Sequence, residues 1–539
     1  MGFYLNTEDA LELYKGETEK PYFVDKTLML GELITILEQG RTHISLTRPR
    51  RFGKSVAAAM IGSFFGKGAD SAGIFSKLKI STDKRYSKHL NNHNVIYINF
   101  SKGPDKCKSY DEYIDYITDG LVQDIREAYP DAVHRRGDTV GSMLANVARK
   151  YRGEKFLLVF DEWDYIFHRS YFTDADRGRF TAFLGDLTKD RGYVEMTYMT
   201  GILPIKKYSG SDTMNHFAEH NMANSAIFGE YFGFTNAEVD ELYKRYLANN
   251  PEPVLSREDL RNWYDGYHNE NGQSLYNPNS VVFALTQNQI GTFWSRAGEY
   301  GELKDYVVND IDGVRDAVML LVAGESVQAD VSEYATTASV LERRDQILSV
   351  MTVYGYLNYY EGCVRIPNKE LEVEFNKIIK EEPQYNYMRE LERESSRILK
   401  ATYECDCDVI AEVLAFVHNT ESPLKSYNDE AELSGSVKLA YLSARNRYNI
   451  CREDQAGIGY VDYIFYPYNR SDDGIILELK VDATPDAALK QIRDKNYALK
   501  FRGKMGEQPK TLGRILLVGI GYSRKNKVHR CKIEVIEKA

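Results

Sequence analysis

The sequence predicts an α/β fold with two separate β-rich regions, one toward each end of the chain. In the N-terminal part an apolar run ends in a basic, proline-containing turn and a stretch of small residues follows, as in a strand, a loop and a helix. Apolar runs at 94–100, 156–161 and 194–199 then alternate with helical stretches, an order typical of a parallel sheet with helices on both faces. Near the C-terminus two β-rich runs, 459–467 and 474–482, flank a polar turn and predict a hairpin.

The chain has 539 residues, which is too long for one hydrophobic core and predicts several domains. Helical patterns and aromatic turns follow residue 230, and the composition changes again near residue 421. The expected parts are a nucleotide domain with an N-terminal arm at 1–230, a helical lid or winged-helix-like subdomain at 231–385, a helical connector at 386–420 and a last domain at 421–539.

Composition and charge exclude several classes of protein. The 43% hydrophobic and 27% charged residues are typical of a soluble globular protein, and no window approaches the ~20 apolar residues that span a bilayer. The net charge of −10 argues against a protein that coats nucleic acid by bulk electrostatics. Residues 485–539 nevertheless hold 14 Lys and Arg against 5 Asp and Glu, so this end is where a polyanion would be received.

The cysteines and the N-terminus indicate a reducing compartment. Six scattered cysteines form neither paired zinc knuckles nor a dense disulfide framework. The first residues lack a basic region followed by an apolar core and therefore do not form a secretory signal. We expect a cytoplasmic protein without a membrane partner.

The stretch ISLTRPRRFGKS at 44–55 predicts a phosphate-binding loop between a strand and a helix. In such a loop the backbone N–H groups cradle phosphates, the lysine reaches the β- and γ-oxygens and the hydroxyl binds Mg²⁺. Position 48, where the usual pattern has its first glycine, is Arg48, so the entry of the loop cannot follow the usual backbone course. A helix start without a nucleotide is the alternative. The residues expected around the nucleotide are Arg48, Pro49, Arg50, Arg51, Phe52, Gly53, Lys54 and Ser55.

A second element, FLLVFDEWD at 156–164, is an apolar run that ends in two consecutive carboxylates. After a phosphate loop, one carboxylate holds Mg²⁺ and its neighbour activates the attacking water. Asp161 is the predicted Mg²⁺ contact, with Ser55, and Glu162 the predicted base. The run that ends in Thr200 predicts a further strand whose polar tip senses the γ-phosphate. A buried strand before a solvated acidic turn is the alternative.

The C-terminal hairpin carries a second set of chemistry-bearing residues. Glu478 and Lys480 are two residues apart and share one face of a strand, and Asp462 on the preceding strand can meet them. Two carboxylates that hold Mg²⁺ beside an ammonium suit metal-assisted phosphodiester hydrolysis, whereas a surface ion pair is the alternative. Either Glu430 or Glu432 could complete the metal site, and we favour Glu430. A following helix with Gln491, Lys495 and Tyr497 is expected to face a nucleic-acid backbone.

Together these motifs resemble the bacterial predicted AAA-ATPase-like proteins with a C-terminal PD-(D/E)XK nuclease-superfamily domain. The motifs that carry this resemblance are 22–27, RPRRFGKS at 48–55, FDEWD at 160–164, WYDGY at 263–267, YNPNSV at 276–281, NDE at 428–430, VD at 461–462, ELK at 478–480 and Gln491 with Lys495 and Tyr497. The resemblance implies an AAA-type nucleotide fold and a restriction-endonuclease-like α/β domain. Two positions depart from the family: Trp163 replaces a usual tyrosine, and Val461 replaces the namesake proline.

The leading hypothesis is therefore an ATP-binding and ATP-hydrolysing regulator coupled to a Mg²⁺-dependent nuclease. DNA is expected rather than RNA, with a role in mobile-element or phage-defence processes, and the sequence is compatible with an oligomer. The alternative is a signalling or scaffold ATPase whose C-terminal domain binds nucleic acid or protein without cleavage. The presence of Asp462, Glu478 and Lys480 favours the nuclease.

Overall fold

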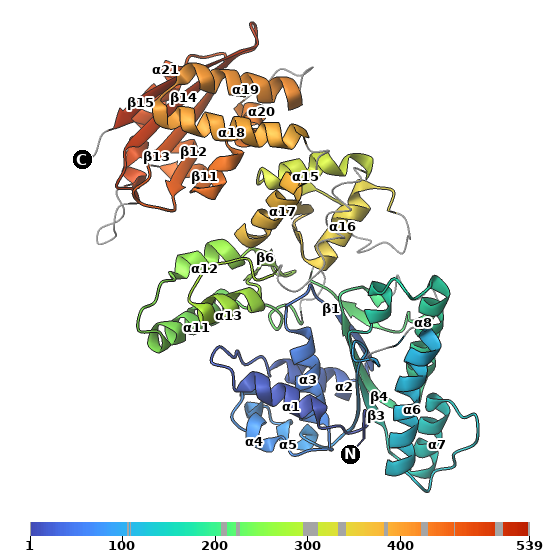
Figure 1. Ribbon diagram of the computed structural model, residues 1–539. Coiled ribbons are helices and arrows are strands. Elements are labelled where there is room, and N and C mark those ends of the chain that lie inside the picture. The colour runs from blue at the N-terminus through green and yellow to red at the C-terminus, as the bar shows by residue number, and fades with distance from the viewer. Residues whose placement is uncertain are drawn as a thin grey trace. The chain divides into compact units, whose positions relative to one another are not determined.

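The computed structural model describes residues 2–104, 107, 109–205, 213–222, 227–294, 311–331, 341–381, 386–421, 430–456, 459–501 and 510–536. The chain divides into two compact units, Met1–Glu374 and Phe375–Ala539, within which the labelled elements can be followed in Figure 1.

The first unit begins with the predicted parallel sheet. Its strands have the order β2-β3-β4-β1-β5, and every neighbouring pair is parallel. The expected apolar runs form four of the strands, and a short fifth strand was not expected. The bounds are β1 His43–Thr47, β2 Asn94–Asn99, β3 Phe156–Asp161, β4 Val194–Gly201 and β5 Ala218–His220.

Helices cover both faces of this sheet (Figure 1). On one face α1, α3, β1 and β4 share a large apolar core, which includes Ile44, Phe64 and Tyr198. The carboxyl ends of the parallel strands stay open for the loops that follow β1, β3 and β4. The helices of this part are α1 Asp9–Thr18, α2 Met29–Glu38, α3 Lys54–Phe65, α4 Ala72–Phe75, η1 Lys79–Thr82, α5 Tyr86–His89, α6 Tyr110–Ala128, α7 Val140–Lys150, η2 Tyr165–His168 and α8 Asp174–Thr188.

A helical part with its own apolar core follows the sheet. Tyr22 of the N-terminal arm packs into this core, and Thr235, Ser256 and Asn277 cap the helices that build it. Its elements are α11 Asn236–Asn249, α12 Arg257–Tyr264, β6 Tyr267–His268, β7 Ser274–Leu275 and α13 Pro278–Gln287.

The described residues at the end of the first unit form helices and a small antiparallel sheet of order β8-β10-β9. Most of α16 is buried. The elements are η4 Ile311–Gly313, α15 Val314–Val322, β8 Val327–Gln328, α16 Arg344–Tyr354, β9 Asn358–Tyr360, β10 Cys363–Arg365 and α17 Lys369–Glu381, which crosses the boundary between the units.

The second unit contains a five-stranded mixed sheet of order β11-β12-β13-β14-β15. In this sheet β13 and β14 are parallel, and the other neighbouring strands are antiparallel. The predicted hairpin is β12–β13. Residues 386–420, predicted as a connector, form two helices of this unit, and α19 packs on β15. The elements are α18 Asn386–Glu404, α19 Cys407–Glu421, α20 Glu430–Ala440, η6 Leu442–Asn446, β11 Tyr448–Ala456, β12 Gly459–Pro467, β13 Gly474–Val481, α21 Pro485–Asp494, η7 Tyr497–Phe501, β14 Ile515–Ser523 and β15 Val528–Ile536.

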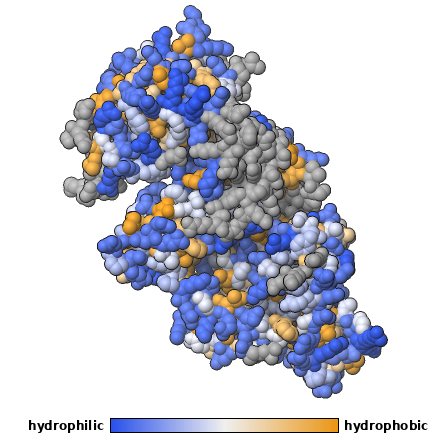
Figure 2. Space-filling model, viewed as in Figure 1, coloured by the Kyte–Doolittle hydropathy of each residue, from blue (hydrophilic) through white to orange (hydrophobic). Residues whose placement is uncertain are grey.

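Hydrophilic residues dominate the visible face of the molecule, and apolar residues form small separate patches on it (Figure 2). Within the described ranges, no helix is both long and apolar enough to cross a membrane. All six cysteines are free thiols.

Candidate active sites

The phosphate loop connects β1 to α3 in the first unit. Gly53 has a φ of 86°, a left-handed conformation that glycine adopts without strain, and Lys54 is the first residue of the helix. Lys54 is 8% exposed, and its ammonium donates hydrogen bonds of 3.0 Å to the carbonyl oxygens of Arg48 and Pro49. The sequence prediction of a strand, a loop and a helix is confirmed here.

The electrostatic setting of Lys54 favours an anionic ligand. Burial lowers the pKa of Lys54 to about 8, although the charges of Asp164, Glu162 and Asp161 oppose this effect. Its direct partners are neutral carbonyl dipoles rather than carboxylates. A phosphate that reached the ammonium would therefore stabilise the charged form.

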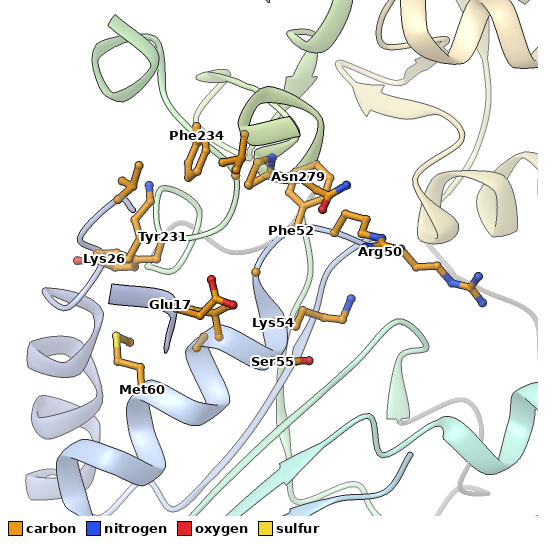
Figure 3. A pocket seen from close by; sticks show the side chains of 18 of the residues that line it. Glu17, Lys26, Arg50, Phe52, Lys54, Ser55, Met60, Tyr231, Phe234 and Asn279 are labelled. Atoms are coloured by element: carbon orange, nitrogen blue, oxygen red, sulfur yellow. The ribbon is translucent and has the colours of Figure 1, made fainter. Parts of the chain in front are cut away.

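A cavity of about 890 Å³ opens above the loop, within the range of ~300–1,000 Å³ that is usual for ligand and cofactor sites. Arg50, Phe52, Lys54 and Ser55 line one side of it. The N-terminal arm and the helical part line the other sides. Their lining residues include Glu17, Lys26, Tyr231, Phe234 and Asn279, all labelled in Figure 3. The cavity thus combines cations at the start of α3 with aromatic rings across from them, a setting that suits a nucleotide.

Arg48 and Pro49 differ from the other predicted loop residues, because neither lines this cavity. Arg48 is 2% exposed. Its guanidinium donates to the carbonyl oxygens of Thr47 and His220 and lies 5.0 Å from the centre of the Phe232 ring. Its side chain therefore ties the loop entry to β5, and only its carbonyl oxygen faces Lys54. This geometry explains how an arginine replaces the usual glycine.

Asp161 and Ser55 provide oxygens where a divalent cation could bind. Asp161 is fully buried, and Asn99 donates a 2.9 Å hydrogen bond to its Oδ2. The other oxygen, Oδ1, is buried without a hydrogen bond to any described group. Burial and the charge of Glu162 raise the pKa of Asp161 to about 7, and the nearby Ser55 hydroxyl and Lys54 lower it. A hard cation such as Mg²⁺ fits this oxygen set and would relieve the unsatisfied carboxylate.

Glu162 follows β3 with a φ of 51°, a left-handed conformation that is uncommon for a residue with a side chain. Its side chain is half-buried and lines the cavity. The position beside Asp161 agrees with the role of a base, which stays a prediction.

Asp164 and His168 also line the cavity, and sequence reasoning missed both. Asp164 Oδ2 accepts 2.8 Å hydrogen bonds from the backbone N–H groups of Ile202 and Leu203 and a 3.1 Å bond from His168 Nε2. Burial would raise the pKa of Asp164, but His168 and these two N–H groups outweigh burial and lower it. The pair therefore connects the loop after β3 to the end of β4. The second aspartate of FDEWD, with a histidine four residues later, was the available signal.

Thr200 makes a structural hydrogen bond. Its buried hydroxyl donates to the carbonyl oxygen of Leu46 at 2.9 Å and is absent from the cavity lining, to which the next residue, Gly201, contributes. Its role as a γ-phosphate sensor stays a prediction that this geometry does not favour.

The residues predicted for the second site lie together in the second unit. Lys480 Nζ lies 3.1 Å from Glu430 Oε1 on α20 and 3.3 Å from Glu478 Oε1 on its own strand. Asp462 Oδ2 accepts a 2.7 Å hydrogen bond from the N–H of Leu479, and the Gln491 amide donates to Glu478 Oε1. The cluster thus combines residues from α20, β12, β13 and α21.

The charges of this cluster shift one another's pKa values. Burial and the nearby charge of Asp462 raise the pKa of Glu478 to about 7, against the effect of Lys480. Burial lowers the pKa of Lys480, but Glu478 and Glu430 outweigh it and raise that pKa. The ammonium is therefore held between carboxylates.

Two of these carboxylates, those of Asp462 and Glu478, fit a divalent cation, since such an ion would relieve their mutual repulsion. No ready group of three metal-binding side chains occurs in the part of the chain that is described. Mg²⁺ commonly uses one or two carboxylates and keeps several waters, so the pair suffices. Glu430 contacts Lys480, and the side chain of Glu432 lies outside the described residues, so the choice between them stays open.

The predicted nucleic-acid contacts are only partly accessible. The helix expected to include Tyr497 ends at Asp494, because Asn496 adopts a left-handed φ of 58°. Tyr497 is fully buried in an apolar cluster, and its hydroxyl lies beside Gln491, so its ring cannot stack on a base. Lys495 is half-buried at the end of α21.

Comparisons with known proteins match both parts of the chain that contain the candidate sites. Residues 14–209 match a family described as predicted AAA-ATPase, and residues 430–529 match the PD-(D/E)XK nuclease superfamily. An uncharacterized protein in the vnfD 5′ region of Azotobacter chroococcum mcd 1 is 23% identical over 529 residues, or 95% of each chain. These findings confirm the family resemblance and, with the two sheets, the fold class.

Two solved structures are similar at low identity. A Walker-type ATPase of Pyrococcus abyssi is 14% identical with a TM-score of 0.33, over 65% of this chain and 95% of its own. The ORC2 protein of Aeropyrum pernix is 13% identical with a TM-score of 0.31, over 66% of this chain and 93% of its own.

Proposed function

We infer that ATP regulates a metal-dependent nuclease in this protein. The inference rests on the chain's two matched regions, one similar to AAA-ATPases and one to the PD-(D/E)XK nuclease superfamily. ATP is bound and hydrolysed in the first unit, and DNA phosphodiester bonds are cleaved in the second, with Mg²⁺ at both sites. Such an activity suits mobile-element or phage-defence processes.

The nucleotide half of this proposal is supported by the buried Lys54 at the start of α3, which faces a large cavity and donates to two carbonyl oxygens. Its ammonium would hold the β- and γ-phosphates. Glu162 would take a proton from the attacking water, and Asp161 with Ser55 would hold Mg²⁺, which supplies charge neutralisation.

The nuclease half is carried by one observation, the convergence of Asp462, Glu478 and Lys480 at one end of β13. Asp462 and Glu478 would hold the divalent cation, which polarises the scissile phosphate when bound. Lys480 would leave its carboxylate partners to orient water or stabilise charge on the phosphate. Gln491 would keep Glu478 in position.

A cleavage panel tests the proposal with the full chain. Double-stranded, single-stranded and branched DNA and RNA are incubated with Mg²⁺ or Mn²⁺, with and without ATP. Wild type is compared with Lys480→Ala, Lys54→Ala and the matched control Lys510→Ala, which changes an exposed lysine of the second unit outside the cluster.

We expect cleavage of DNA by wild type and the control, strongly reduced cleavage by Lys480→Ala, and a response to ATP that Lys54→Ala loses. Undiminished cleavage by Lys480→Ala would contradict the nuclease assignment. Cleavage indifferent to both ATP and Lys54 would mean that the two domains act independently. Nucleic-acid binding without cleavage by wild type would favour the scaffold ATPase instead.

A further inference from the structure

The β14–β15 hairpin concentrates positive charge in a short stretch. Residues 523–532 contain five Lys or Arg and no Asp or Glu. Three of the cations, Arg524, Lys525 and Lys527, belong to the turn between the two strands, and all three are exposed.

Only part of this charge is neutralised by neighbouring carboxylates. Arg524 Nε lies 2.6 Å from Asp482, and Lys532 forms an ion pair with Asp486. Lys525, Lys527 and Arg530 are exposed and form no ion pair with any described residue. These three side chains, the hairpin cations, therefore form a local positive surface on a chain whose net charge is −10.

The register of the sheet places the hairpin turn at the end of β13 where the nuclease residues lie. Glu478 and Lys480 pair with Gly519 and Gly521 of β14, and β14 ends at Ser523. At ~3.3 Å per residue, the end of β14 lies about 7 Å beyond the row of Lys480, and the turn that contains Lys525 and Lys527 follows directly.

Two hydrogen bonds hold this end of the hairpin in place. The Arg524 N–H donates to Asp482 Oδ1 at 2.9 Å, and the Asp482 N–H donates to the carbonyl oxygen of Tyr522 at 2.7 Å. Asp482 follows Lys480 by two residues, so the turn has a fixed position relative to the nuclease cluster.

We propose that the hairpin cations bind the phosphodiester backbone of the nucleic acid a few nucleotides from the phosphate that is cleaved. This inference rests on the proposed nuclease function and adds a binding surface to it. A nucleic-acid strand carries one phosphate per ~3.4 Å of helix rise, so a contact that begins about 7 Å beyond Lys480 reaches the same backbone a few nucleotides away. Exposed ammonium and guanidinium groups are the donors that such a backbone attracts.

A different role for these cations is protection of an edge strand, because β15 lies at the edge of its sheet and edge lysines oppose aggregation. That role predicts a change in self-association and no change in nucleic-acid affinity. The two roles can therefore be separated by experiment.

The test compares two double variants of the full chain, each of which removes two positive charges from the second unit. Lys525→Ala/Lys527→Ala changes the hairpin turn. Arg470→Ala/Lys510→Ala, the matched control, changes two exposed residues near the starts of β13 and β14, at the opposite end of these strands. Affinity for a labelled DNA duplex and for RNA of the same sequence is measured by fluorescence anisotropy in EDTA at several salt concentrations.

For the hairpin variant we expect binding about tenfold weaker. The plot of log affinity against log salt concentration should also be less steep by about two units, since each lost phosphate contact contributes ~0.9 to its slope. The control variant should bind as wild type does. A loss confined to the duplex or to the RNA identifies which polymer the hairpin contacts.

Wild-type affinity in the hairpin variant, with cleavage by wild type intact, would overturn this inference and leave the proposed function standing. A wild type that neither binds nor cleaves any substrate would overturn both. If the alanine variant aggregates, Lys525→Gln/Lys527→Gln keeps polar side chains and removes the same charge. Sedimentation of each variant then reports edge protection separately.

Discussion

The two candidate active sites each contain a lysine beside buried carboxylates, yet the two lysines are held in opposite ways. Lys54 donates to carbonyl oxygens, and burial lowers its pKa to about 8. Lys480 is held by Glu430 and Glu478, which raise its pKa despite burial. Among the described residues, no carboxylate contacts the first lysine directly, whereas the second already has two such partners.

This difference indicates what each site requires from its ligand. An anionic ligand supplies the charge that Lys54 lacks, so the nucleotide site is prepared to bind phosphate. Lys480 must leave a carboxylate partner before it can contact the substrate. A cation bound to Glu478 would neutralise that carboxylate and so weaken the ion pair between Glu478 and Lys480. The nuclease site therefore depends on metal binding before its lysine can act.

The largest effect should come from Glu162→Gln, which tests the chemistry of the nucleotide site alone. The amide keeps the shape of the side chain but cannot take a proton from water, so ATP turnover should fall by about 10²–10⁴ while ATP binding survives. Steady-state hydrolysis and calorimetric binding measure the two effects. Glu127→Gln, at an exposed position of α6, is the control. Unchanged turnover would assign the activation of water to another group.

Lys480→Met should separate metal binding from cleavage at the other site. The ammonium is not a ligand, so Mn²⁺ affinity should persist while single-turnover cleavage falls by about 10²–10³, as when a charge-stabilising donor is removed. Asp462→Asn should instead weaken Mn²⁺ binding. Equal metal affinities in the two variants would contradict the assignment of Asp462 as a ligand.

Local sequence patterns predicted the parts of both sites that lie at strand ends. The loop before Lys54, the acids after β3 and the pairing of β12 with β13 follow from apolar runs and from the two-residue period of a strand. Such features depend on neighbours in the sequence, which explains why they could be predicted.

The remaining features depend on contacts between distant residues. Arg48 turns away from the cavity because His220 and Phe232, more than 170 residues later, accept its guanidinium. Thr200 bonds to β1, and the ring of Tyr497 is covered by an apolar cluster. No spacing rule in a single sequence reveals such partners.

Lys54→Ala tests the contrast between the two lysines by ATP affinity, whereas Glu162→Gln and Lys480→Met test the two sites by reaction rates. Charge-assisted hydrogen bonds contribute about 1.5–3 kcal/mol, so ATP affinity should fall by about tenfold to a hundredfold. Calorimetry with the exposed-lysine variant Lys77→Ala as control measures this change. Equal ATP affinity in Lys54→Ala and wild type would remove the lysine from the nucleotide site.

The smallest and most specific effect is the pH dependence of ligand affinity. As pH rises, ATP affinity at the first site should fall, whereas Mn²⁺ affinity at the second site should rise. Bound phosphate raises the pKa of Lys54 above its value of about 8 in the free protein, so ATP binding takes up a proton above that pH. Without metal, ATP affinity should be level from pH 7 to 8 and then fall by up to tenfold per pH unit. A divalent cation instead displaces the proton of Glu478, whose pKa is about 7, so Mn²⁺ affinity at the nuclease site should rise up to pH 7 and level above it.

Calorimetric ATP titrations in EDTA, and Mn²⁺ titrations without ATP, measure the two profiles from pH 5.5 to 9.5. Asp161, whose pKa is also about 7, could bind Mn²⁺ too, so the metal profile is taken as the difference between wild type and Glu478→Gln. Lys54→Ala should lose the fall in ATP affinity above pH 8 and keep the Mn²⁺ profile. If ATP affinity showed no bend near pH 8, or if metal affinity did not change below pH 7, the opposite electrostatic settings of the two sites would be contradicted.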